Sequence, residues 1–239
     1  MATIHFILQG KGGVGKSMIA SLLFQACKRA EKNVIAFDTD PVNRTLARYK
    51  EFDVTEIEIM KGSDIDQRKF DVLFEGLVSA PADSQVIVDN GASSFVALGA
   101  YLEQNEVLQA LDEEGHKVFF HTVITGGQAI VDTCSGLSEL AENFSVPIVV
   151  WLNPFFGDIE INGKKFDEFE VYKNNSGKFH SIIQIPDLPQ TTYGKDLEEL
   201  FAKKQSFEAG IATSCFAIKR RLGVFWNQIY EQIQSADIF

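Results

Sequence analysis

Apolar and polar positions alternate in blocks along the chain, and the blocks have two lengths. Short continuous apolar runs are typical of strands buried on both faces, whereas longer segments with apolar residues every three or four positions are typical of amphipathic helices. The strands that this pattern predicts are Ile4–Gln9, Asn33–Asp38, Val54–Met60, Gln85–Asp89, Lys117–Thr125, Pro147–Asn153 and Phe179–Ile185. The predicted helices are Ser17–Ala30, Ile65–Ser79, Phe95–Glu114, Gln128–Asn143, Gly194–Phe201 and Phe207 to about Ser235.

The order of these elements predicts the fold class. Strands that alternate with helices form a parallel sheet covered on both faces, because each crossover helix returns the chain to the same end of the sheet. We therefore expect an α/β fold with a doubly wound, mostly parallel sheet. The pattern breaks over residues 157–176, where Asn162-Gly163 predicts the turn of a small hairpin outside the sheet. No linker or repeat divides the chain, so we expect a single domain over residues 1–239.

Composition narrows the class of protein. The chain is 45% hydrophobic and 23% charged, which is typical of globular proteins. Its formal net charge of −11 disfavours a protein that coats nucleic acid. The three cysteines lie too far apart for a disulfide framework or a metal site. The first residues lack the pattern of a signal peptide, and no apolar run is long enough to cross a bilayer, so the expected location is the cytoplasm.

One segment matches the phosphate-loop pattern G-x-x-x-x-G-K-[ST]: Gly10, Lys11, Gly12, Gly13, Val14, Gly15, Lys16 and Ser17. In this pattern the backbone N–H groups surround phosphate oxygens at the start of a helix. Lys16 would reach the β- and γ-phosphates, and the hydroxyl of Ser17 would ligate Mg²⁺. The segment lies between a predicted buried strand and a predicted amphipathic helix, which is the context that the motif requires. We therefore predict a nucleotide site that includes these residues and Met18, with Lys16 in a catalytic role.

The second lysine of the loop, Lys11, gives the deviant form KGGxGK[ST]. With this form the chain resembles the family of ParA, MinD and the nitrogenase iron protein. The resemblance implies that ATP is the nucleotide and that two subunits form a homodimer around it. It also implies that Lys11 reaches across the dimer to the nucleotide of the partner subunit, as a catalytic and nucleotide-binding residue.

Two acidic segments follow predicted strands, where ligands collect in a doubly wound sheet. Asp38-Thr39-Asp40-Pro41 resembles the first switch of the same family. The resemblance implies that Asp40 orients the attacking water and that Asp38 supports Mg²⁺ or its water shell. A carboxylate beside Mg²⁺ is chemically sufficient, because phosphoryl transfer needs positioning more than a strong base. Aspartates at strand ends also commonly cap turns, so that structural role is the alternative.

The apolar run Val86-Ile87-Val88 ends in Asp89, which has the form of a Walker B strand. Asp89 would act on Mg²⁺ through water, so the predicted metal residues are Ser17, Asp38, Asp40 and Asp89. The next residues, Asn90-Gly91-Ala92-Ser93-Ser94, depart from the family, whose second switch usually continues with threonine or serine and prolines. Gly91 would still offer its N–H to a γ-phosphate. The departure leaves the hydrolysis rate and the partner open, but not nucleotide binding.

Two later segments resemble the part of the family's site that holds the base. Trp151-Leu152-Asn153-Pro154 resembles a strand end whose asparagine contacts adenine, and Ile185-Pro186-Asp187 resembles a segment whose backbone covers the ring. Asn153, Pro186 and Asp187 are therefore predicted to bind the nucleotide. An asparagine before proline at a strand end is also an ordinary turn, which is the alternative interpretation.

Several stretches, among them DNGASSF and TGGQA, are similar to the TraL-type conjugal-transfer ATPases and the StbB-type plasmid stability proteins over nearly the whole chain. This resemblance implies a Mg-ATP switch with slow hydrolysis, partnered by a plasmid transfer or maintenance protein. The alternatives are a partition ATPase that binds DNA non-specifically and a nucleotide-binding interaction module without significant hydrolysis. A ligase such as dethiobiotin synthetase uses the same loop, but the chain has no cluster of basic residues to hold a small carboxylate substrate.

The last predicted helix bears on DNA and membrane partners. Its apolar stripe predicts core packing and not a membrane helix, because the helix ends in Glu231 and Asp237 where a membrane helix would have lysines. Basic residues near this helix form a modest patch that either contacts DNA phosphates or is a solvated face: Lys203, Lys204, Lys219, Arg220 and Arg221. The four histidines have no metal-ligand spacing, so we expect structural roles for them.

Overall fold

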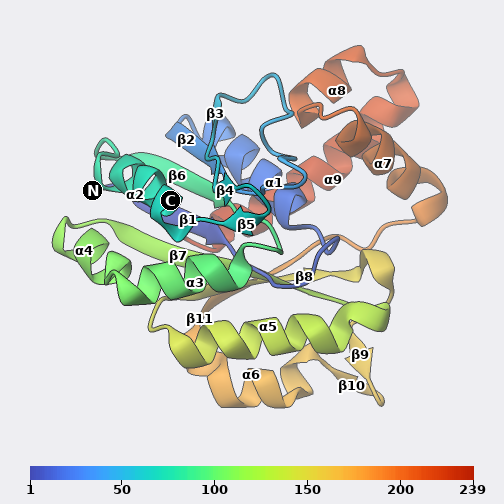
Figure 1. The fold of residues 1–239 in the computed structure, drawn as a ribbon. Helices are drawn as coiled ribbons and strands as arrows, with labels where there is room; N and C mark the ends of the chain where they lie inside the picture. Colours follow the sequence, from blue (N-terminus) through green and yellow to red (C-terminus); the bar gives the residue numbers. More distant parts are fainter.

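The structure is a computed structural model that describes residues 1–239 (Figure 1). Its central sheet has seven strands in the order β11-β8-β7-β1-β6-β2-β3, and every neighbouring pair is parallel. The strands are β1 (Thr3–Ile7), β2 (Asn33–Asp38), β3 (Val54–Glu56), β6 (Ser84–Asp89), β7 (Lys117–Thr125), β8 (Ile148–Asn153) and β11 (Phe179–Gln184). The order reverses on either side of β1, so the predicted doubly wound parallel sheet is confirmed.

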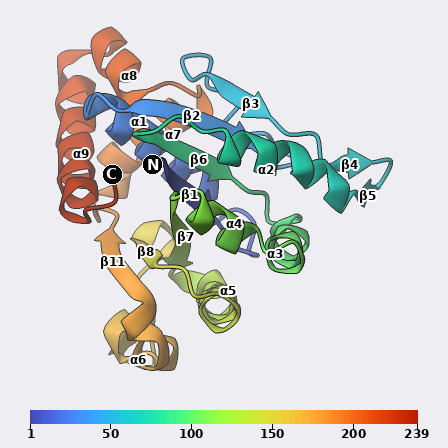
Figure 2. The same ribbon diagram turned by 90° about the vertical axis from the view of Figure 1, so that its left-hand side faces the viewer.

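Helices cover both faces of the sheet (Figures 1 and 2). One face carries α1 (Lys16–Arg29), α7 (Lys195–Ala202), α8 (Phe207–Thr213) and α9 (Phe216–Ser235). The other face carries α2 (Phe70–Val78), α3 (Phe95–Gln104), α4 (Val107–Glu113), α5 (Ile130–Asn143) and α6 (Glu170–Asn175). The two cores contain 31 and 30 buried residues, so the hydrophobic core is divided about equally between the two faces of the sheet. Alternate residues of the central strands enter different cores, which is why these strands are largely apolar.

A row of polar side chains crosses the buried sheet from β6 to β8. His5 Nδ1 lies 2.9 Å from His121 Nε2, and His5 Nε2 lies 2.9 Å from Gln85 Oε1. Trp151 Nε1 donates to His121 Nδ1 at 3.0 Å. Because an indole nitrogen can only donate, His121 carries its proton on Nε2 and donates to His5, which in turn donates to Gln85. Burial lowers the pKa of His5 to about 4 and that of His121 well below its usual value, so both rings are neutral.

Two predicted long helices are each broken into two. The segment Phe95–Glu114 forms α3 and α4, separated at Glu106, which has a left-handed backbone with φ 49°. The last helix breaks before Phe216, where Cys215 is extended at φ −67° and ψ 163°, and so becomes α8 and α9. The single-helix predictions were wrong because apolar spacing continues through each break. Each break turns the second helix so that its own apolar face packs on the core.

The edge of the sheet formed by β3 also differs from the prediction. β3 ends at Glu56, and Ile57 and Ile59 continue as a buried loop, in which only the N–H of Ile57 still donates to the sheet, to the carbonyl of Asp38 at 2.9 Å. A small hairpin follows, with β4 (Met60–Lys61) and β5 (Asp64–Ile65) joined at Gly62. This hairpin occupies the start of the helix predicted at Ile65, so α2 begins only at Phe70.

The segment 157–176 contains the predicted hairpin and one helix that the sequence pattern missed. β9 (Glu160–Ile161) and β10 (Lys164–Lys165) are joined by Asn162 and Gly163, both with positive φ, as a tight hairpin turn requires. The short helix α6 then packs beside α5 (Figure 1). At the other end of the chain, the apolar stripe of α9 is buried, as predicted. No helix combines the length and the apolar character that crossing a bilayer requires.

Candidate functional site

The phosphate loop leaves the end of β1 and leads into α1, which begins at Lys16. Gly13 and Gly15 have φ values of 76° and 111°, a region that side chains disfavour, so glycine is needed at both positions. The ammonium group of Lys16 donates to the carbonyl of Lys11 at 3.0 Å and closes over the loop. Burial lowers the pKa of Lys16, while the carboxylates of Asp89 and Asp40 act in the opposite direction. The loop therefore holds a cation above the N-terminus of a helix, which suits phosphate.

The other loop lysine points elsewhere. Lys11 Nζ lies 2.7 Å from Asp132 Oδ2 on α5, and the two side chains are 43% and 55% exposed. Lys11 lines neither cavity of the site described below. In this single chain, Lys11 is therefore bound to the surface of its own subunit and lies away from the phosphate position.

Two aspartates at neighbouring strand ends lie beside the loop. Asp38 and Asp89 are register partners at the ends of β2 and β6. Asp38 accepts hydrogen bonds from the backbone of Asp40 at 3.0 Å and Ala47 at 3.1 Å, whereas both oxygens of the fully buried Asp89 have no partner. Burial, reinforced by the charge of Asp38, raises the pKa of Asp89 to about 8. A buried carboxyl group without a hydrogen-bond partner marks a position that suits water or a cation.

The residues beside the loop suit a Mg²⁺ ion that has few direct protein ligands. No three acidic, histidine or cysteine side chains converge as ligands. An ion here would therefore take the hydroxyl of Ser17, phosphate oxygens and water, with Asp89 acting through a water. This arrangement suits Mg²⁺, which keeps several waters and binds beside phosphates. Asp40 lies farther out, where its Oδ1 accepts from the backbone of Val42 at 2.8 Å and Asn43 at 3.1 Å.

Asn90, which is unusual for a second switch of this type, has a structural role through its hydrogen bonds. The buried side-chain oxygen of Asn90 accepts from the Thr39 hydroxyl at 2.9 Å and from the Ser94 hydroxyl at 2.8 Å. Asn90 thereby joins the first switch to the start of α3. Gly91 packs against Asp40 so closely that a Cβ atom on Gly91 would lie 2.8 Å from Cγ of Asp40. The two switches are in direct contact at this point.

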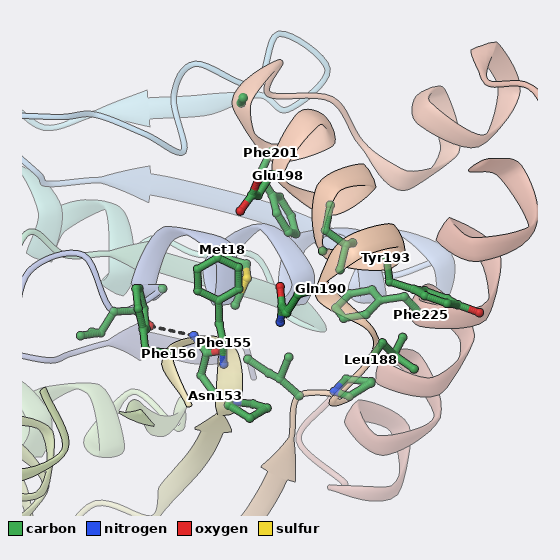
Figure 3. A pocket seen from close by; sticks show the side chains of 18 of the residues that line it. Met18, Asn153, Phe155, Phe156, Leu188, Gln190, Tyr193, Glu198, Phe201 and Phe225 are labelled. Carbon is green, nitrogen blue, oxygen red and sulfur yellow. Dashed lines mark hydrogen bonds between the residues drawn. The ribbon is translucent and has the colours of Figure 1, made fainter. Parts of the chain in front are cut away.

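Two cavities that share part of their lining adjoin the loop, and we call them together the cleft. Figure 3 shows the side chains of the first. The first has a volume of about 360 Å³, and apolar side chains predominate in its lining, among them Met18, Phe155, Phe156, Leu188 and Phe225. The second, of about 560 Å³, lies over the phosphate loop and contains Lys16, Ser17 and Asp40. They share Gly13, Gly15, Met18, Phe201 and Lys204. An apolar cavity of this size next to a polar one suits a ligand with a flat ring at one end and charge at the other.

The predicted base-binding residues are only partly brought together. Asn153 and Pro186 line the apolar cavity, whereas Asp187 is exposed and does not. Asn153 Nδ2 donates to the carbonyl of Val14 at 3.0 Å, and its Oδ1 accepts from the backbone of Phe155 at 3.2 Å. Asn153 therefore ties the phosphate loop to the end of β8, in addition to facing the cavity. Residues that sequence reasoning did not assign to this cavity include Gln190, Tyr193, Phe201 and Lys204, which lie in and around α7 outside any motif.

The basic patch near α9 is partly neutralised. Lys203 pairs with Glu199 at 3.1 Å, and Arg221 pairs with Asp196 at 2.5 Å. Lys219 and Arg220 are exposed and have no ion pair. The free positive charge on this face is therefore smaller than the sequence implied.

Comparison with known proteins agrees with this site. A family model described as "CobQ/CobB/MinD/ParA nucleotide binding domain" matches residues 5–225. Two proteins from Escherichia coli, both named Protein TraL, are 46% and 43% identical to the chain over 242 residues, covering all of each sequence.

Among solved structures, the fold is similar to that of the MinD cell division protein of Aquifex aeolicus. The TM-score is 0.57 at 14% identity, over 98% of this chain and 97% of that one. It is also similar to a plasmid partition protein from Borrelia burgdorferi bound to AMPPNP, with a TM-score of 0.53 at 18% identity, over 98% and 99% of the two chains. At these identities the likeness shows the fold alone.

Proposed function

The chain belongs to the family of CobQ/CobB/MinD/ParA nucleotide-binding domains, and we propose that it is a switch that binds Mg-ATP and hydrolyses it slowly. We propose further that it acts in plasmid conjugative transfer or stability, as one ATPase domain over residues 1–239. The observation that carries the proposal is the cleft, in which an apolar cavity shares part of its lining with a phosphate-loop cavity containing Lys16 and Asp40. The relatives named TraL support the connection with conjugation.

Each residue has a role in this proposal. Lys16 binds the β- and γ-phosphates, which also receive the N–H groups of the loop. Ser17 ligates Mg²⁺, Asp89 holds a water of the ion, and Asp38 supports that water shell. Mg²⁺, held by Ser17 and through water by Asp89, would neutralise the negative charge that develops on the phosphates. Asp40 orients the attacking water. The missing hydrogen-bond partners of Asp89 support the position of the ion.

ATP is proposed to stabilise a homodimer that recruits a plasmid transfer or maintenance protein. In that dimer Lys11 leaves Asp132 and reaches the nucleotide of the partner subunit. The partial exposure of the Lys11–Asp132 pair supports this, since a solvent-exposed ion pair opposes the movement only weakly. Placing Lys11 in trans makes the assembly dependent on ATP, which is the property of a switch.

A nucleotide-binding module without significant hydrolysis is the second candidate. It is favoured by the hydrogen bonds that engage Asp40 with the turn at Val42 and Asn43. A carboxylate used as a turn cap is less available to a water. A partition ATPase that binds DNA non-specifically is a third candidate, which rests on the exposed Lys219 and Arg220.

Nucleotide binding is tested first, with labelled ATP and purified protein in the presence of Mg²⁺. We expect wild type to bind and Lys16→Ala to bind at least tenfold more weakly, because the lysine makes charge-assisted hydrogen bonds to the phosphates. Lys203→Ala, which removes an exposed lysine that lines neither cavity, serves as the control. Equal affinity of wild type and Lys16→Ala would refute the proposed site.

The switch is tested by light scattering with and without Mg-ATP. We expect a dimer only with ATP, and a dimer that persists in Asp40→Ala because hydrolysis is lost. Phosphate release that is measurable in wild type and absent in Asp40→Ala excludes the module without hydrolysis. A monomer that binds ATP and releases no phosphate would favour it. Turnover that DNA accelerates, and that charge reversal at Lys219 and Arg220 makes insensitive to DNA, would favour the partition ATPase.

A further inference from the structure

The cleft contains a second lysine that no motif of the chain includes. Among the residues that line the phosphate-loop cavity, Lys16 and Lys204 are the cations and Asp40 is the anion. Lys204 also lines the apolar cavity, so it stands where the two cavities meet. Lys204 follows the end of α7. This helix is one of the C-terminal helices that cover one face of the sheet (Figure 1).

Lys204 has no charged partner within the chain. Its ammonium group makes no ion pair, although the neighbouring Lys203 pairs with Glu199. Its one recorded side-chain contact is with the ring of Tyr49, whose centroid lies 6.0 Å from Nζ. Tyr49 is itself buried and stacked on Phe52, with ring centroids 4.7 Å apart. The lysine is thus held beside the loop that follows the first switch, with its hydrogen-bonding groups unused.

Lys204 is partly buried and has a like charge, Arg48, near it. Burial, and secondly the charge of Arg48, lower the pKa of Lys204 below its usual value. A partly buried ammonium group beside a like charge is stabilised by an anion more than an exposed lysine is, because less water and less salt screen it. The cavity that it lines opens toward the phosphate loop, so the anion that fits here is a phosphate.

We propose that Lys204 binds the α-phosphate of the nucleotide, at the junction between base and triphosphate. The assignment follows from position, since the α-phosphate is the phosphate nearest the base and Lys204 is the cation shared by the two cavities. It rests on the proposed function, because it assumes a nucleotide in the cleft. The contact joins α7 to the phosphates and brings the C-terminal helices into nucleotide binding. Lys204 is a binding residue and takes no part in the chemical step.

The backbone at Lys204 offers a way to remove the side chain without harm. Lys204 has a left-handed backbone with φ 52°, and it ends α7 in a turn where Lys204 N–H bonds to Phe201 and Gln205 N–H bonds to Leu200. Glycine is the preferred residue at this position of a helix end. Lys204→Gly is therefore expected to melt no lower than wild type. Glu31 ends α1 in the same kind of turn, with φ 57°, so Glu31→Gly is the matched control for the backbone change.

The test measures dissociation constants for ATP, ADP and AMP by calorimetry. Loss of one charge-assisted hydrogen bond predicts that Lys204→Gly binds all three about tenfold more weakly. Glu31→Gly and Lys203→Ala are expected to bind as wild type does, and Lys204→Arg is expected to recover most of the loss. The equal effect on AMP is the distinguishing result, because AMP retains only the α-phosphate.

Each other outcome overturns the proposal. A loss confined to ATP would place Lys204 at the γ-phosphate, and a loss for ATP and ADP without AMP would place it at the β-phosphate. Unchanged affinities in Lys204→Gly would show that the lysine does not touch the nucleotide. If wild type itself binds no nucleotide while remaining folded, the proposed function fails instead. Lys16→Ala separates the two failures, since it tests the phosphate loop without touching Lys204.

Discussion

Lys11 of the phosphate loop and Asp132 of α5 form an ion pair, with Nζ 2.7 Å from Oδ2. The pair joins the loop to the helix that follows β7. A lysine held this way cannot at the same time reach a nucleotide in another subunit. The pair therefore favours the single chain over the proposed dimer, by an amount that its partial exposure keeps small. Exposed pairs of this kind contribute about 0–1 kcal/mol.

Asp132→Asn removes this restraint on Lys11. We expect the dissociation constant of the ATP-dependent dimer to be about two- to fivefold lower than that of wild type. This factor corresponds to the free energy of an exposed ion pair. Sedimentation over a range of protein concentrations with Mg-ATP measures the effect. Glu199→Gln, which frees Lys203 from a comparable surface pair, is expected to change nothing. A weaker dimer in Asp132→Asn would mean instead that Asp132 belongs to the interface.

The buried histidines predict how stability depends on pH. The folded-state pKa of His5 is about 4, below its unfolded value of about 6.5, so only the unfolded chain takes up this proton as the pH falls between those values. Stability is therefore fully present above pH 6.5 and is lost toward pH 4. His5 alone should lower the free energy of unfolding by about 2 kcal/mol between pH 7 and pH 5. His121, whose pKa is also lowered, adds to the loss in the same direction.

Denaturant unfolding at pH 7 and pH 5 measures this loss in wild type and in His5→Gln. The variant is expected to be less stable at pH 7, since the hydrogen bond to His121 is disturbed. It should nevertheless lose less stability than wild type on going to pH 5, because one titrating group is gone. Equal losses in the two proteins would show that His5 does not contribute to the acid sensitivity.

The sequence predicted the sheet well because the information is local. Buried parallel strands are short apolar runs, and β2 and β7 begin and end where the pattern places them. The phosphate loop is also a local signal, since its glycines and its lysine lie within eight residues. The breaks at Glu106 and Cys215 had no such signal. No glycine or proline marks them, and the apolar residues keep helical spacing on both sides, so the core alone determines where each helix turns.

The parts of the site that were missed depend on contacts between distant segments. Lys204 enters the cleft only because the end of α7 and the phosphate loop line the same cavity, and nothing in its neighbourhood in the sequence indicates a ligand. Asp132 likewise meets Lys11 across 121 positions. Asp187 was assigned to the nucleotide through its backbone, by resemblance, and its side chain is exposed outside both cavities. A pattern at fixed spacing cannot report such arrangements, because they are set by how elements pack.

The proposed role of Asp89 predicts how ATP affinity depends on Mg²⁺. Its two oxygens are buried without partners, so we expect it to bind the ion's water when Mg-ATP enters. Asp89→Asn keeps the shape of the side chain and removes the charge that Asp89 would acquire on losing its proton when a cation binds. Wild type is expected to bind ATP more tightly with Mg²⁺ than with EDTA, and Asp89→Asn is expected to lose most of that difference. A variant that responds to Mg²⁺ as wild type does would remove Asp89 from the metal site.

The contact between Gly91 and Asp40 connects the two switches and predicts the effect of a single methyl group. A Cβ atom at Gly91 would lie 2.8 Å from Cγ and 3.0 Å from Cα of Asp40, closer than van der Waals contact allows. In Gly91→Ala the first switch must therefore move, and Asp40 moves with it. Displacing a positioned catalytic group by about 1 Å lowers the reaction rate by about a hundredfold, so phosphate release should nearly cease.

Nucleotide binding should survive in Gly91→Ala, because the phosphate loop and the apolar cavity lie on other segments. We expect the affinity for ATP to stay within about threefold of wild type, which is less than the loss of one hydrogen bond to a charged group. Gly177→Ala is the control, since a Cβ atom there meets nothing within 4 Å. Phosphate release at the wild-type rate in Gly91→Ala would mean that the position of Asp40 is not critical for hydrolysis. The catalytic role proposed for Asp40 would then be lost, and nucleotide binding by the loop would stand without it.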